Sequence, residues 1–307
     1  MRLTFAREIL TAAFLIFQSW NAFPSTAVFI VTKSGIVAAT DGKSFSYTEQ
    51  RAGIIQKLVL LHERVLVAEI GLADIQASKK AIREVVKSGR DVPQWVKDFV
   101  PFHFPDWMRG IEKRTSHDIS MAILARTVKD EADRTFGTAA PVLKEMAMNH
   151  RPPFEDEKRL VAVFVLAGFE ENYIPTIYSV TIELNRNDLS VMPGKIEHVH
   201  PEPGTKVDDK FYMPAGSAQK AIGNIVGHPE TGEYKSMPAQ AQIELAQLHK
   251  AEALTTAQAQ DLLTALVSQE IVASGNDVGW PIWFGSIPKY GRPLLVQSRK
   301  PAKNIKK

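Results

Sequence analysis

The chain has 307 residues and a mass of 34.1 kDa, long enough for one large domain or two small ones with a full hydrophobic core. Apolar residues make up 45% and charged residues 23%, which excludes a disordered, collagen-like or coiled-coil protein. Lys and Arg number 37 against 34 Asp and Glu, a balance that does not indicate nucleic-acid binding. The absence of cysteine excludes disulfides, thiolate zinc sites and a cysteine nucleophile. A mean hydropathy of -0.12, without an apolar run of 18 residues, excludes a polytopic membrane protein.

The first 24 residues have the layout of a segment that is removed from the mature protein. A basic start precedes the apolar stretch Ile9–Phe17, and the small residues Ser25–Ala27 follow. This order is typical of a secretory signal peptide, cut before Val28 or, less favourably, at Ala22. As a helix the apolar stretch rises only about 14 Å, too short for a hydrocarbon core of about 30 Å. An amphipathic helix is the alternative, favoured by Glu8.

Two strand pairs and two helices are expected in the first half of the chain. β-branched runs predict the strands Val28–Val31, Ile36–Ala39, Leu58–Leu61 and Val65–Ala68. Apolar residues at helical spacing predict helices over Leu72–Ser88 and over Thr115–Arg134, the second capped by Ser116. Between these helices, Arg90–Asp106 is rich in proline and aromatic residues. We expect an irregular or short-helical segment there whose aromatic side chains pack onto the core.

Strands return in the second half, around a helical region. The expected strands are Arg159–Ala167, Thr176–Glu183, Val278–Ile287 and Arg292–Gln297. The expected helices are Ser217–Val226 and Ala239–Val272, the latter broken or capped near Thr255 and Thr256. Asp188–Lys210 is predicted to be a polar loop, and residues 298–307 a basic flexible tail.

The order of strands, helices, strands, helices and strands lacks regular βαβ alternation. This order predicts an α+β domain with antiparallel sheets. Neither a repeat nor a long linker interrupts residues 25–297, which we expect to form a single domain.

Four short segments at the start of this domain resemble one family. They are Ser25–Val31, Lys33–Asp41, Lys57-Leu58 and Gly71–Asp74. Asp41 lies 16 positions after Ser25 (41 − 25), and Lys57 lies 32 positions after it (57 − 25). These segments and separations resemble the proteasome-type N-terminal nucleophile hydrolases, including the HslV-like branch. The resemblance extends loosely over residues 25–297, but only its first 50 residues are specific. It implies a four-layer αββα sandwich of two antiparallel sheets with helices outside.

In that family a serine or threonine hydroxyl attacks an amide, and the base is the α-amino group of the same residue. Such an amine has a pKa of about 7.7–8.0, so part of it is neutral at physiological pH. An amide nitrogen is no base, and the peptide bond before the nucleophile must therefore be cut. The gapless register makes Ser25 the nucleophile, with Lys57 stabilising the alkoxide and Asp41 holding that lysine. If the first hairpin were shorter by one residue, the nucleophile would be Thr26 instead. The sequence leaves both residues open as the nucleophile.

The same resemblance implies the remaining site residues. Asp277 is a candidate to support the amine, and Gly71, Gly216 and Ser217 are candidate substrate-binding residues. Gly71 would permit the substrate backbone to approach closely.

The function implied is hydrolysis of peptide or other amide bonds, and the alternative is a catalytically inactive binding or assembly protein. The partners implied are a peptide or amide substrate and a second copy in a homo-oligomer, with neither nucleic acid nor a membrane span after processing. We expect a periplasmic or secreted protein, or alternatively a cytoplasmic one with a self-cleaved propeptide.

No cofactor and no metal ion are expected. Sequence patterns typical of α/β-hydrolases, zinc proteases, P-loop proteins and dinucleotide-binding proteins are absent. His198 and His200 place two imidazoles on one side if extended, but the prolines and glycines nearby favour a solvated loop over a metal site.

Overall fold

The structure is a computed structural model. It describes residues 25–32, 34–45, 52–72, 74–75, 102–148, 159–170, 173–201, 210–214, 217, 220–227, 232–249, 254–274 and 278–298. No helix within these ranges is long and apolar enough to cross a membrane.

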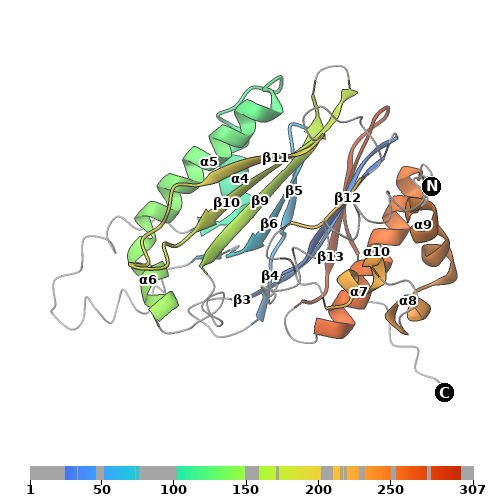
Figure 1. Ribbon diagram of the computed structural model, residues 1–307. Helices are drawn as coiled ribbons and strands as arrows, with labels where there is room; N and C mark the ends of the chain where they lie inside the picture. Colours follow the sequence, from blue (N-terminus) through green and yellow to red (C-terminus); the bar gives the residue numbers. More distant parts are fainter. Residues whose placement is uncertain are drawn as a thin grey trace, which may run out of the picture.

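Two five-stranded antiparallel sheets form the middle of the molecule (Figure 1). The first sheet has the order β12-β1-β2-β13-β14. Its strands are β1 (Ala27–Thr32), β2 (Gly35–Asp41), β12 (Lys210–Tyr212), β13 (Ile282–Pro288) and β14 (Leu294–Ser298). The second sheet has the order β11-β10-β9-β6-β5. Its strands are β5 (Leu58–Leu61), β6 (Val65–Gly71), β9 (Leu160–Phe169), β10 (Pro175–Glu183) and β11 (Lys195–His200). Two further antiparallel sheets have two strands each: β3 (Lys43–Phe45) with β4 (Ala52–Ile54), and β7 (Asp74–Ile75) with β8 (Phe102–His103).

The two sheets pack face to face because their strands are apolar on both sides. In β1, Phe29 and Val31 enter the core between the sheets, whereas Val28 and Ile30 face the outer layer. Strand β9 alternates in the same way, with Val163 in the inner core. A strand that is buried on both faces has a continuous apolar sequence, and β1 and β9 both have this pattern.

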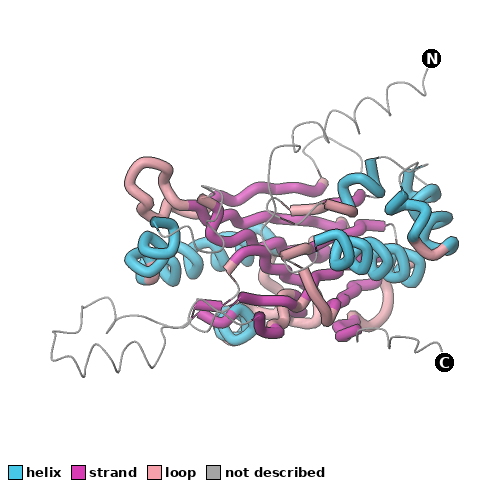
Figure 2. Tube along the Cα trace, turned by 90° about the horizontal axis from the view of Figure 1, so that it is seen from below, coloured by secondary structure: helices cyan, strands magenta, loops and turns pink. Residues whose placement is uncertain are grey.

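Helices cover the outer face of each sheet, as Figure 2 shows from below. The second sheet packs on α4 (Phe104–Glu112), α5 (Met121–Thr138) and α6 (Ala140–Met148). The first sheet packs on α7 (Ile222–Gly227), α8 (Gly232–Ser236), α9 (Ala239–His249) and α10 (Thr256–Ser274). The order helix, sheet, sheet, helix confirms the predicted αββα sandwich.

Several local predictions differ from the structure. The helix expected over Thr115–Arg134 starts only at Met121, because the side chain of Ser120, not that of Ser116, accepts the N–H of Ile123. The helix expected over Leu72–Ser88 does not begin at Leu72, since β7 follows; residues 76–101 lie outside the described ranges.

The polar loop expected over Asp188–Lys210 was also wrong, since it contains β11. This strand forms an edge of the second sheet, and its first four residues are exposed, so its polar composition does not prevent pairing with β10. The helix expected over Ser217–Val226 is limited to α7 among the described residues. Ser298, expected in the tail, ends β14, and residues 1–24 and 299–307 lie outside the described ranges.

Candidate functional site

The β1–β2 hairpin brings Ser25 and Thr26 beside Asp41. Ala27 pairs with Thr40 in the hairpin register, and the Asp41 N–H donates to the Thr26 carbonyl at 3.1 Å. The hydroxyl-bearing residues therefore lie just before the first strand, next to the carboxylate that ends the second.

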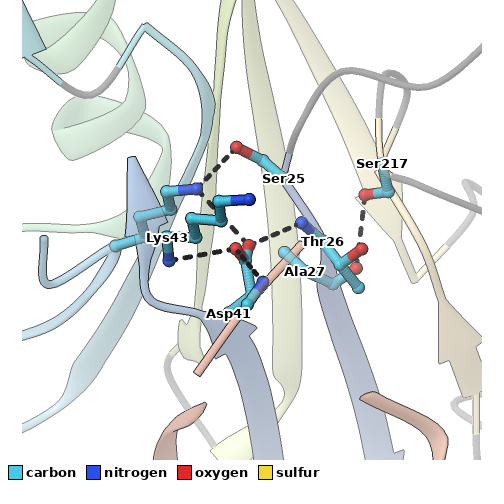
Figure 3. A network of polar contacts seen from close by, with 8 residues as sticks. Ser25, Thr26, Ala27, Asp41, Lys43 and Ser217 are labelled. Carbon is cyan, nitrogen blue, oxygen red and sulfur yellow. Dashed lines mark hydrogen bonds and ion pairs between the residues drawn. The ribbon is translucent and has the colours of Figure 1, made fainter. Parts of the chain in front are cut away.

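Lys57 joins this pair from the other sheet, directly before β5. Its Nζ donates to Ser25 Oγ at 2.7 Å and to Asp41 Oδ1 at 3.4 Å. Figure 3 shows the polar contacts around Ser25, Thr26 and Asp41. The side chains of Asp41 and Lys57 are fully buried, as is Ser25. An ammonium that bridges a hydroxyl and a carboxylate stabilises negative charge on the hydroxyl oxygen.

Thr26 has a different position relative to the same carboxylate. Its backbone N donates to Asp41 Oδ1 at 2.8 Å. If the chain began at Thr26, this nitrogen would be an ammonium paired with a carboxylate, which keeps its proton and is a poor base. The choice of nucleophile between Ser25 and Thr26 stays a prediction.

Asp41 accepts hydrogen bonds at both carboxylate oxygens. Besides Thr26 and Lys57 at Oδ1, the backbone N–H groups of Lys43 at 3.1 Å and Gly279 at 3.3 Å donate to Oδ2. Burial raises the pKa of Asp41, whereas Lys57 and these N–H groups oppose the rise. Four donors around two oxygens suit the ionised carboxylate.

Lys43 and Gly279 were missed from the sequence because they act through backbone N–H groups, which every residue except proline carries. A Cβ at Gly279 would lie 2.9 Å from Cδ of the flexible Lys43 side chain, which would have to shift if Gly279 were replaced.

Glu69 on β6 is another residue that sequence reasoning missed. Its side chain is fully buried, and burial raises its pKa to about 8, while Lys57 lowers the pKa and Asp41 raises it. The available signal was a single acidic residue within an otherwise apolar strand, VLVAEIG.

Gly71 and Ser217 lie close to these elements. Gly71 has φ +110°, and a Cβ there would lie 2.5 Å from the Val161 carbonyl oxygen, so the neighbouring strand already requires glycine. Ser217 Oγ donates to the Ala27 carbonyl at 3.4 Å, which ties its segment to the start of β1. A substrate contact at either residue stays a prediction. Gly216 and Asp277 lie outside the described residues.

Glu270 on α10 binds the start of α7. Its carboxylate accepts the backbone N–H groups of Lys220, Ala221 and Ile222 at 2.8–3.0 Å and the hydroxyl of Ser274. A carboxylate at a helix start satisfies N–H groups that lack a partner within the helix. Glu270 therefore fixes the start of α7 against α10.

The histidine pair is not in a solvated loop, which corrects the sequence prediction. His198 and His200 belong to β11, where His198 is exposed and its ring stacks on Tyr178 at 4.6 Å, whereas His200 is buried. Within the described residues, no three His, Cys, Asp or Glu side chains are grouped as they would be to hold a metal ion.

No family model matches the chain. No curated protein matches it either. Among solved structures, the chain is similar to a Gly-1 mutant of Anbu from Hyphomicrobium sp. strain MC1, at 12% identity and a TM-score of 0.45, over 91% of this chain and 89% of that one. It is also similar to Anbu from Pseudomonas aeruginosa, solved as a helical assembly, at 14% identity and a TM-score of 0.42, over 91% and 88% of the two chains. Likeness at this level identifies no family, and the fold assignment is based on the sheets and layers of this chain.

Proposed function

We propose that the chain is a proteasome-like N-terminal nucleophile hydrolase, which cleaves peptide or other amide bonds after the segment before Ser25 is removed. The observation that carries the proposal is the 2.7 Å contact between Lys57 Nζ and Ser25 Oγ, with Asp41 bound to the same ammonium. These three residues come from different elements, and the fold brings them together at the start of β1.

The reaction begins once cleavage before Ser25 creates a free α-amine. The neutral amine takes the proton of Ser25 Oγ, and the oxygen attacks the substrate carbonyl. The Lys57 ammonium stabilises the negative charge that develops on Oγ, and Asp41 holds the ammonium in place. The leaving amine takes the proton from the α-ammonium, and water then hydrolyses the Ser25 ester by the same base.

Access to Ser25 is a second requirement of the reaction. The Ser25 residue is fully buried in the intact chain, so its hydroxyl is closed to a substrate. The uncut protein is therefore expected to be an inactive precursor.

Residues 1–24 enter this proposal as the segment that is removed, either a signal peptide of a periplasmic or secreted protein or a propeptide of a cytoplasmic one. Self-cleavage requires a hydroxyl at the cut, whereas a signal peptidase does not. The proposal also includes that copies of this chain assemble into a homo-oligomer.

The deciding experiment combines intact mass, N-terminal sequencing and hydrolysis of a mixed peptide library. Wild type should begin at Ser25 and hydrolyse peptides. Ser25→Ala should lower the rate of a correctly processed chain by at least about 10³-fold, because the nucleophile is gone. Thr26→Val, which keeps the side-chain volume and the backbone N–H to Asp41, is the matched control and should retain activity.

Three results would contradict the proposal. A mature chain that starts at Val28 lacks the nucleophile, and one that keeps Met1 lacks the free amine at Ser25. Equal activity of wild type and Ser25→Ala would remove Ser25 from the reaction. A stable, uncut and inactive protein would instead support the alternative of a binding or assembly protein with this sandwich.

A further inference from the structure

A buried carboxyl group on β6 has no role in the reaction described above. Glu69 is fully buried, and within the described residues neither of its carboxylate oxygens has a hydrogen-bond partner. Burying an unpartnered polar group is costly, and a buried charge without a donor costs far more. The neutral, protonated acid is therefore the form that this position tolerates.

The strand register places Glu69 beside the lysine of the candidate site. Leu58 pairs with Ala68, and the next pair brings Lys57 opposite Glu69, whose N–H donates to the Lys57 carbonyl at 2.9 Å. Residues opposed across two antiparallel strands have their side chains on the same face of the sheet. Glu69 and Lys57 are therefore direct neighbours, and Lys57 in turn contacts Ser25.

Among the residues that the structure describes, two charged groups act on Glu69. The Lys57 ammonium and the Asp41 carboxylate are the charges that act on it. By alternation along β6, Glu69 shares the outer face of Val67, where α4 and α5 of the described chain contribute apolar residues such as Met108 and Val128.

Asp41 and Glu69 divide the charge unequally. In the part of the chain that the structure describes, Asp41 has four donors at its oxygens and Glu69 has none, so Asp41 is the carboxylate that balances Lys57. If Glu69 were ionised, its carboxylate would compete with Ser25 for the ammonium of Lys57, because Glu69, Ser25 and Lys57 lie in one buried cluster.

We propose that Glu69 is a positioning residue that acts through Lys57: as a neutral acid it leaves the ammonium to Ser25 and Asp41, and when it loses its proton in alkaline solution it draws the ammonium away from Ser25. Its effect on catalysis is based on the proposed function, but its charge state and its coupling to Lys57 are not. The proton passes to solvent, and no bond other than O–H changes.

The first test follows stability against pH in the full-length chain, comparing wild type with Glu69→Gln. The glutamine has the size of the neutral acid and carries no charge. Because the pKa of Glu69 rises from 4.5 in the unfolded chain to about 8 when folded, the folded state holds a proton that the unfolded state lacks in that window. Stability from this proton is fully present below pH 4.5 and is lost as pH rises toward 8. The unfolding constant of wild type should therefore increase relative to that of the variant, by up to about tenfold per pH unit. Parallel curves would overturn the proposal.

A second measurement reads the same proton without unfolding. The infrared spectrum of folded wild type should contain a carboxylic-acid carbonyl band that disappears around pH 8. The spectrum of Glu69→Gln should lack this band. In Lys57→Met the band should persist to higher pH, because the ammonium that favours the ionised form is gone, whereas Lys57→Arg should leave its midpoint in place. An absent band, or a midpoint that Lys57→Met does not move, would overturn the charge state or the coupling.

The catalytic consequence is measured on the processed enzyme. Wild-type kcat/KM should fall in alkaline solution with a midpoint near that of the infrared band, and Glu69→Gln, normalised to its own value at pH 7, should lack this fall. Identical profiles would overturn the effect on Ser25. The infrared result together with an inactive wild type would refute the proposed hydrolase and leave the Glu69–Lys57 coupling standing.

Discussion

Replacing Asp41 with asparagine tests the geometry of the candidate site without reference to activity. Each carboxylate oxygen accepts two donors, so an amide NH₂ in either place meets donors instead of acceptors. In one orientation Thr26 N and Lys57 Nζ lose their acceptor, and in the other Lys43 N and Gly279 N do. Each buried N–H without a partner costs about 1–3 kcal/mol, and removing one charge of a buried ion pair costs about 3–5 kcal/mol. These groups touch one another, so the costs do not add, and we expect a loss of about 3–6 kcal/mol.

The assay is equilibrium unfolding in urea, with the free energy of unfolding extrapolated to water. The matched control is Asp118→Asn, where the side chain is 93% exposed and paired with His117, and it should change stability by no more than about 0.5 kcal/mol. The N-termini of all proteins are checked by mass spectrometry, because cleavage before Ser25 would itself alter the site. A loss below about 1 kcal/mol for Asp41→Asn would refute the reasoning, since the four donors would then not depend on the carboxylate.

Three further predictions concern the elements around the site, and denaturant unfolding measures each. Glu270→Ala should cost about 3 kcal/mol, because three backbone N–H groups at the start of α7 lose their acceptor, and Glu270→Gln should cost less because it keeps one oxygen. Equal losses would contradict the N–H contacts. Gly71→Ala should cost at least about 2 kcal/mol, because φ is +110° and the new Cβ would meet the Val161 carbonyl at 2.5 Å; a neutral change would refute this account of the glycine. Ser120→Ala should cost about 1 kcal/mol and Ser116→Ala less than half of that, since only Ser120 caps α5; the reverse order would place the helix start where the sequence predicted it.

The residues of the candidate site were named from the sequence because their segments and separations resemble those of one family. A hairpin fixes which residues are neighbours, so Asp41 falls beside Ser25 and Thr26 once the turn at Gly35 is recognised. Lys57 was named by the resemblance alone, from its separation of 32 positions from Ser25 (57 − 25). Its contact with Ser25 crosses from one sheet to the other, so the distance itself depends on how the sheets stack.

Local patterns failed where tertiary contacts replaced local signals. Strand β11 is polar because it is an edge strand, and its pairing with β10 supplies the hydrogen bonds that its composition does not predict. The cap of α5 moved from Ser116 to Ser120, since both serines fit a cap and only the packing of Met121 and Leu124 on the sheet distinguishes them.

The α+β class and most strands of the two sheets were predictable from the sequence, because apolar periodicity is a local property of the chain. The residues of the proposed chemistry were named by the resemblance of short segments to one family. Only the tertiary structure shows that Lys57 donates to Ser25, that Gly279 completes the shell of Asp41, and that Glu69 is enclosed without a donor among the described residues. These depend on burial and on backbone groups from distant segments, and neither leaves a pattern in the order of the amino acids.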